Sequence, residues 1–177
     1  MTSCAAPGHV RSWNSPAPGC GKEIWQKCAP TVRERCAAGR AVVLVDTSVW
    51  IEAFRKPPRI RMEALVDFDS VVTCLPVIQE VLQGFLEERA YATARDALRS
   101  LPIVESPLRA QIFDEAVQLY RSARRAGHTV RSGVDCLIAA CALRNDLTVL
   151  HRDRDYGVLA KVSGLKVEEV LKPRVGL

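Results

Sequence analysis

The sequence predicts an α/β fold of three layers, with helices on both faces of a mostly parallel central sheet. From residue 42 onward, short runs of β-branched and aliphatic residues alternate with segments of helical periodicity. At 177 residues the chain is long enough for one domain with a substantial core. A hydrophobic content of 48% and a charged content of 25% are typical of a soluble globular domain.

The elements of the first half begin and end at recognisable signals. Val42–Val45 is a strand-like run, and Asp46 with the two hydroxyl residues after it can cap the next helix. Pro57-Pro58 ends that helix, and Pro76 suits the first turn of a later one. The expected elements are strand 42–45, helix 49–54, helix 60–68, strand 71–74, helix 76–87 and helix 90–101.

In the second half, Ser106-Pro107 predicts the start of a long amphipathic helix that ends at Gly127. Ser132 starts a helix that is hydrophobic on all faces and is therefore expected to be buried. The expected elements are strand 103–105, helix 107–125, helix 133–143, strand 148–151, helix 153–162 and edge strand 166–170.

Residues 1–41 are expected to stand apart from the domain formed by residues 42–177. They are rich in Pro, Gly, Ala, Ser and Cys and show no sustained period, which is typical of a disordered leader. The alternative is a misassigned start, with the true start codon near Val42, Val43 or Val45. Most of the net charge of +5 lies in this leader, so it says little about a nucleic-acid face on the domain.

Cysteine usage and hydropathy indicate a cytoplasmic protein without a membrane span. The four cysteines of the leader lack a C-x-x-C pair, which argues against a zinc knuckle. Because the sequence has no secretory signal, a disulfide framework is not expected. Cys74, Cys136 and Cys141 lie in apolar runs, where free thiols behave as small hydrophobes. No apolar stretch approaches the roughly 18 residues of a transmembrane helix.

Asp135 is the one charged residue of its apolar helix, and its burial would cost several kcal/mol without a cation or strong donors. Asp46, Glu80 and Asp153 follow predicted strands or lie near helix starts, where ligands of parallel sheets bind. Helix N-termini should help to hold Glu80 and Asp135 ionised, while four carboxylates together would raise one another's pKa. A hard divalent cation resolves that conflict, and oxygen ligands suit Mg²⁺ or Mn²⁺.

Each acid taken alone also has a structural explanation. These explanations are a capping box with Ser132 for Asp135, a turn after a strand for Asp46, a solvated ion pair for Glu80, and an ordinary helix start for Asp153 and Asp155. Their joint placement favours the metal site.

Four ordered segments of this sequence resemble the PIN-domain ribonucleases, and within them the VapC-type toxins of toxin–antitoxin pairs. The segments are 43–51, 77–82, 134–140 and 149–156, and the resemblance covers about residues 42–170. It implies a three-layer PIN-like domain that hydrolyses RNA phosphodiesters with water activated by one or two Mg²⁺ ions, Mn²⁺ being the alternative. No side-chain nucleophile is then needed.

The resemblance also implies roles for particular residues. The catalytic and metal-binding acids are Asp46, Glu80, Asp135 and Asp153, with Thr47 and Ser48 supporting the metal site and Asp155 as an auxiliary acid. His151-Arg152 departs from the family, which often has Thr-Asn or similar before the last acid. That departure leaves the fine geometry near Asp153 open.

RNA, a cognate antitoxin and a second copy of the chain are the implied partners. Arg131 and Arg152 are candidate contacts to the RNA backbone. Arg121, Arg124 and Arg125 are weaker candidates, because cations are favoured at a helix C-terminus in any case. Several apolar residues could form either a dimer or antitoxin surface or part of the core, and the core is slightly favoured. They are Trp50, Phe54, Val81, Leu82 and Phe85.

Two other functions compete with that of a nuclease. An aspartyl-nucleophile phosphatase needs a second Asp two residues after the first, and Ser48 stands there instead. A catalytically silent PIN-like module that binds RNA or protein is the remaining alternative. Turnover of RNA separates this module from a nuclease.

Overall fold

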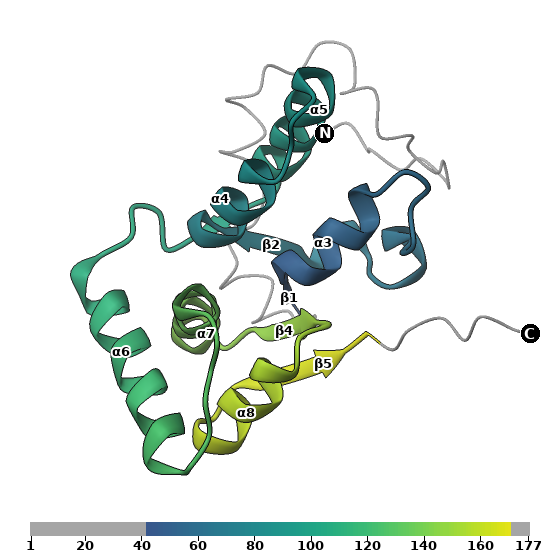
Figure 1. The fold of residues 1–177 in the computed structure, drawn as a ribbon. Coiled ribbons are helices and arrows are strands. Elements are labelled where there is room, and N and C mark those ends of the chain that lie inside the picture. The colour runs from purple at the N-terminus through teal and green to yellow at the C-terminus, as the bar shows by residue number, and fades with distance from the viewer. Residues whose placement is uncertain (1–41, 171–177) are drawn as a thin grey trace, which may run out of the picture.

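A computed structural model describes residues 42–170, so the predicted leader 1–41 and the segment 171–177 lie outside the described residues. The described chain forms a five-stranded sheet in the order β3-β2-β1-β4-β5. Figure 1 shows β2, β1, β4 and β5 following one another across this sheet. Every pairing in it is parallel, which confirms the predicted α/β class. The strands are β1 (Val43–Val45), β2 (Val71–Cys74), β3 (Ile103–Val104), β4 (Thr148–His151) and β5 (Lys166–Glu169).

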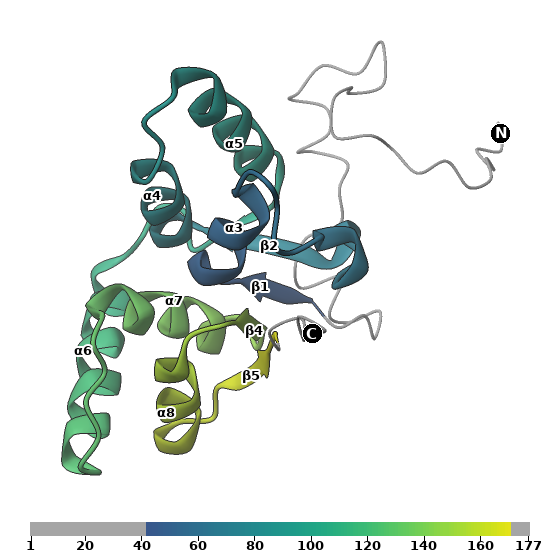
Figure 2. The same cartoon turned by 45° about the vertical axis from the view of Figure 1, so that its right-hand side comes forward.

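Helices lie on both sides of this sheet, as the views in Figures 1 and 2 show. The chain moves from β1 outward to β3, then returns across the sheet to β4 and β5. Because such crossovers are right-handed, the first and second groups of helices are placed on opposite faces. The groups are α3 (Thr47–Phe54), α4 (Leu75–Gln83) and α5 (Glu88–Ser100), then α6 (Ala110–Arg125), α7 (Gly133–Arg144) and α8 (Arg154–Val162).

The core runs through the central strands and α7. Every residue of β1 and β2 is buried, which is expected of parallel strands covered on both faces. Trp50 and Val81 are 1% and 2% exposed and belong to this core, whereas Phe54, Leu82 and Phe85 are partly buried against it. The preference for core over an interaction surface is therefore confirmed for Trp50 and Val81.

Two of the predicted helices differ in the structure. The segment 60–68 forms only short 3₁₀ turns at Met62–Ala64 and Phe68–Ser70, because its buried residues Ile60 and Met62 do not continue as a helical stripe. The helix predicted from Ser106-Pro107 begins only at Ala110. Arg109 before it is extended, and Leu108 packs against the core from this extended stretch.

Several helix ends follow the sequence signals. α4 ends at Gln83, four residues before the predicted end, because Gly84 occupies its C-cap. Gly127 follows the last turn of α6 with a φ of 78°, a conformation that glycine adopts without strain.

Within residues 42–170, no helix combines the length and the apolar character that a bilayer span requires.

Candidate active site

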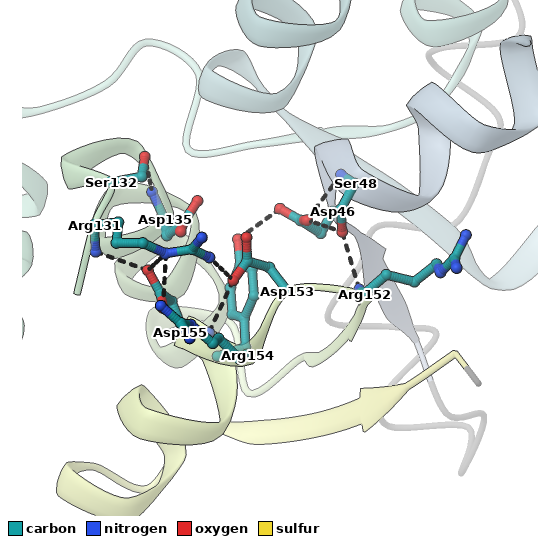
Figure 3. Close-up of polar contacts among 10 residues, drawn as sticks. Asp46, Ser48, Arg131, Ser132, Asp135, Arg152, Asp153, Arg154 and Asp155 are labelled. Carbon is teal, nitrogen blue, oxygen red and sulfur yellow. Dashed lines mark hydrogen bonds and ion pairs between the residues drawn. The ribbon is translucent and has the colours of Figure 1, made fainter. Parts of the chain in front are cut away.

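The candidate site lies where β1 and β4 run side by side. Val45 pairs with Leu150, and Asp46 N–H continues the contact by donating to the Leu150 carbonyl at 2.9 Å. The two strands lead to helices on opposite faces, so this edge is the topological switch point where open parallel sheets bind ligands. Asp46 and Asp153 follow these neighbouring strands and arrive at the same edge (Figure 3).

Asp46 is held in a fixed orientation by donors on both of its oxygens. It is the N-cap of α3 and is 2% exposed. Its Oδ2 accepts from the Ser48 N–H at 2.9 Å and from the Ser48 hydroxyl. Its Oδ1 accepts from the Tyr156 hydroxyl at 2.6 Å. The predicted turn role of Asp46 is thus real, and the same side chain also faces the other acids.

Ser48 links the loops after β1 and β4. Its hydroxyl donates to Asp46 and accepts from the Arg152 N–H at 2.9 Å. The Arg152 guanidinium lies 3.3 Å from Glu52 of α3, and the two side chains are only 14% and 15% exposed. The structure therefore places Arg152 in an ion pair between the two loops, and its contact with RNA stays a prediction.

Glu80 reaches the site from the second turn of α4. Thr47, the first residue of α3, donates its hydroxyl hydrogen to Glu80 Oε2 at 2.9 Å. Burial raises the pKa of Glu80, the Thr47 hydrogen bond lowers it, and the Asp46 charge raises it, with a net rise. The predicted supporting residue Thr47 thus positions Glu80 directly.

Asp135 lies in the first turn of α7 and is 9% exposed. Ser132 caps this helix and accepts from the Val134 and Asp135 N–H groups, which is one half of the capping box. The Asp135 carboxylate itself accepts no hydrogen bond from the described residues. Capping by Ser132 therefore explains the helix start and leaves the buried carboxylate of Asp135 without a donor.

Burial raises the pKa of Asp135 from 3.8 to about 7, with further rises from Asp46, Asp153, Glu80 and Asp155. The expected mutual repulsion of the acids is therefore present. Near these helix N-termini, burial and neighbouring negative charge outweigh the helix dipole, because the pKa of Glu80 and that of Asp135 are both raised.

Arg131 joins the last two acids of the site. Asp153 is the N-cap of α8, and its Oδ1 accepts from Arg131 Nη2 at 2.6 Å. Asp155 is 2% exposed and accepts from the Arg131 N–H at 2.7 Å and from its Nε. Asp155 therefore anchors the loop before α7, and Arg131 is paired with acids within the site (Figure 3).

The donor set fits a divalent cation in its chemistry. A buried carboxylate without a hydrogen-bond donor among the described residues, Asp135, lies near four further acids whose charges raise its pKa. In the present arrangement no three His, Cys, Asp or Glu side chains of residues 42–170 converge closely enough to hold an ion. Tyr156, Thr47 and Arg131 engage Asp46, Glu80 and Asp153 respectively, and rotation of these side chains would be needed for joint coordination.

Sequence reasoning missed Tyr156 and Glu52 as parts of the site. Tyr156 is fully buried, and burial and the Asp46 charge raise its pKa well above 10, so its hydroxyl remains a donor. Its signal was its place three residues after Asp153, on the same face at the start of a helix. His151 is also buried, and its ring packs against that of Tyr156 with 5.0 Å between the ring centroids.

The sequence matches the family model of the PIN domain over residues 43–164. It is 37% identical over 130 residues to the VapC ribonuclease Mb1587 of Mycobacterium bovis, covering 71% of this chain and 96% of the relative. The same identity and coverage hold for the ribonuclease VapC11 of Mycobacterium tuberculosis. Ribonuclease VapC18 of Mycobacterium tuberculosis is 32% identical over 133 residues, covering 73% of this chain and 96% of the relative.

Solved structures share the fold. DNA-bound VapBC from Salmonella typhimurium aligns with a TM-score of 0.59 at 20% identity, covering 73% of this chain and 98% of that chain. VapBC2 from Rickettsia felis, bound to a promoter DNA fragment, aligns with a TM-score of 0.58 at 18% identity, covering 73% and 98%. At these identities the likeness concerns the fold.

Proposed function

The chain belongs to the PIN-domain family, among its VapC ribonucleases, and on this premise we propose that it is an endoribonuclease acting as the toxin of a toxin–antitoxin pair. The observation that carries the proposal is that Asp46, Glu80 and Asp153, which come from three other elements, lie near enough to buried Asp135 at the switch point of the sheet for their charges to raise its pKa. A buried, donor-free carboxylate among other acids is costly for a structural site, and it suits one that binds a cation.

The residues that would hold Mg²⁺ or Mn²⁺ are Asp46, Glu80, Asp135 and Asp153. When bound, such a cation supplies Lewis-acid chemistry for phosphodiester hydrolysis that leaves 5′-phosphate and 3′-hydroxyl ends. The chain itself supplies orientation: Tyr156 and Ser48 fix Asp46, and Thr47 holds Glu80. Arg131 holds Asp153 and Asp155, and Asp155 is an auxiliary residue through that contact.

The buried thiols near the site, Cys136 and Cys74, are not suited to act as nucleophiles. Cys136 follows Asp135, and burial with the charges of Asp135 and Asp155 raises its pKa to about 11. A hydrogen bond with Cys141, together with burial, raises the pKa of Cys74 well above 9. Both thiols are therefore neutral and weakly nucleophilic at neutral pH.

The partners follow from the same premise. The relatives are named ribonucleases, and two of the structural neighbours are described as VapBC from bacteria. RNA as substrate, a cognate antitoxin, a homodimeric state and a cytoplasmic location are therefore part of the proposal, as is a leader at residues 1–41 separate from the nuclease domain.

The proposal is tested by incubating the purified full chain with total RNA and Mg²⁺ or Mn²⁺. Cleavage should require the cation, disappear in EDTA and disappear in Asp135→Asn. Asp114→Asn, an exposed acid of α6 with no ion pair among the described residues, is the matched control and should cut like the parent.

A selective nuclease can leave total RNA intact, so expression of the unaltered chain in bacteria provides a second reading. Growth arrest by the parent and by Asp114→Asn, absent in Asp135→Asn, supports the proposal. Intact RNA together with harmless expression of the parent overturns it in favour of a silent binding module.

A further inference from the structure

A groove beside the acids runs along α8 and is referred to here as the α8 groove. It has a volume of about 450 Å³ and lies between the loop after α6 and the outer face of α8. Its lining residues are Gly127, His128, Thr129, Arg154, Asp155, Gly157, Val158 and Lys161. Nothing lies within 4 Å of a Cβ built on Gly127 or Gly157, so these positions leave the groove open to a ligand.

The cations of this groove are free to meet a ligand. The Arg154 side chain is 79% exposed, and among the described residues its one ion-pair partner is Asp155, at the long distance of 3.9 Å. Lys161 is exposed and forms no ion pair within the described part of the chain. Asp155 is the one acid of the lining, and Arg131 already occupies it with its backbone N–H and its Nε.

A second groove shows that this charge pattern is particular to α8. It has a volume of about 500 Å³ and lies between α6 and α7, where Asp114 and Glu115 line it. Its cation, Arg144, is already paired with Glu115 at 2.7 Å and with Glu105 at 3.6 Å. The two grooves are similar in size, but the α8 groove presents a cation without an ion pair among the described residues, Lys161, and a highly exposed one, Arg154, in a long ion pair.

The α8 groove is continuous with the acids. Asp155 belongs to both, and Arg154 lies between Asp153 and Asp155 at the start of α8. Arg154 and Lys161 are seven residues apart, so they share one helix face about 10 Å apart along the axis. This spacing lets each cation contact a different phosphate of one extended strand.

We propose that the α8 groove binds the phosphate backbone of a single RNA strand through Arg154 and Lys161 and leads that strand into the acidic site. This inference rests on the proposed ribonuclease function and adds to it the path of the substrate. It also shifts the expected backbone contacts from Arg131 and Arg152, whose ion pairs are 2.6 and 3.3 Å long, to Arg154 and Lys161. The ion pair of Arg154 is 3.9 Å long, and Lys161 has none among the described residues.

The test measures binding of a short fluorescein-labelled oligouridylate to the full chain by fluorescence anisotropy in EDTA. The double variant Arg154→Gln/Lys161→Gln is compared with the parent and with Arg89→Gln/Arg99→Gln. Arg89 and Arg99 are exposed residues of α5, at the other end of the molecule, with no ion pair among the described residues (Figure 1). Both double variants remove two positive charges.

Each lost contact to a single-stranded backbone reduces the slope of log affinity against log salt by about 0.7. The groove variant should therefore lose about 1.4 from the slope and bind roughly tenfold more weakly near 50 mM salt. The control should stay within about twofold of the parent, with a slope close to the parental value. Lys161→Gln alone should lose about half of the slope change.

The remaining outcomes overturn the proposal. Equal binding by the parent and the groove variant means that RNA follows another path, and equal weakening of both double variants means that only net charge matters. Tighter binding of a poly-glutamate peptide than of the oligouridylate means that the groove accepts an acidic polypeptide. Cleavage of RNA by the parent, measured separately, shows in each case whether the ribonuclease function still stands.

Discussion

Tyr156 donates a hydrogen bond of 2.6 Å to Asp46 Oδ1 across a sequence separation of 110 residues. The phenol comes from the first turn of α8 and the carboxylate from the start of α3. Ser48 supplies two donors to Oδ2, its N–H and its hydroxyl, so Oδ1 is the Asp46 oxygen with a lone-pair direction still available. Asp46 is therefore oriented before any ligand arrives.

Replacing Tyr156 by Phe tests this orientation. The change removes one donor and leaves a buried carboxylate oxygen unsatisfied, so the free energy of unfolding should fall by about 1–3 kcal/mol. Loss of an orienting partner of a metal ligand typically costs about 10–100-fold in metal affinity or activity. Calorimetric titration with Mn²⁺ and the cleavage rate at saturating RNA are the measurements.

Tyr120→Phe, which removes a hydroxyl from half-buried Tyr120 of α6, is the matched control and should leave both quantities unchanged. An unchanged Mn²⁺ affinity in a well-folded Tyr156→Phe variant would show that Asp46 does not depend on this donor.

Asp135 should make the stability of the protein depend on pH in EDTA. Its pKa is about 7 in the folded chain and 3.8 ordinarily, so the folded state binds this proton more tightly than the unfolded state. The free energy of unfolding should therefore decrease as the pH rises from about 4 to about 7, by roughly 2–4 kcal/mol. Asp135→Asn should abolish this decrease in the free energy of unfolding.

Thermal unfolding in EDTA at about pH 5 and about pH 8 measures the effect. At the higher pH the Asn variant should melt roughly 5–10 °C above the parent, and at the lower pH the two should nearly coincide. A constant difference at both values would mean that Asp135 does not carry the pH dependence.

Arg131 places a positive charge on Asp153, a residue that the proposed function assigns to the cation. Arg131→Gln removes this competing charge and should tighten Mn²⁺ binding by about tenfold, which corresponds to about 1.4 kcal/mol. The same change removes a bond to buried Asp155 and should lower the free energy of unfolding by about 1–2 kcal/mol.

Arg95→Gln, which breaks an exposed pair with Asp96 on α5, controls for the loss of one charge and should change neither quantity. Weaker Mn²⁺ binding in Arg131→Gln would contradict the prediction and would make Arg131 an orienting residue for Asp153 rather than a competitor.

Arg152 is expected to stabilise the fold through Glu52. Arg152→Ala should lower the free energy of unfolding by about 1–3 kcal/mol, because both side chains are about 15% exposed and Glu52 loses its least exposed partner. Arg55→Ala removes a more exposed partner of the same Glu52, 47% exposed, and should cost under about 1 kcal/mol. Equal effects of the two substitutions in urea unfolding would refute this assignment.

The strands and the acids could be predicted because their signals are local. The runs 71–74 and 148–151 coincide with β2 and β4, and an acid after a strand of a parallel sheet has a predictable position. Ser48, two residues from Asp46, could be predicted as a supporting residue, but the pairings of Asp46 with Tyr156 and of Asp153 with Arg131 join segments far apart in the sequence, so no local pattern identifies them. The helix predicted at 60–68 was wrong for a related reason, since the apolar content of this segment did not show that only Ile60 and Met62 are buried.

The hydrogen bond between Tyr156 and Asp46 has a consequence during synthesis of the chain. β1 leaves the ribosome early, but its neighbour β4 and the phenol of α8 are among the last described segments to be made. Until they arrive, Asp46 lacks one of its donors and Asp153 does not exist beside it. The proposed site is therefore incomplete until residues 153–156 have been made.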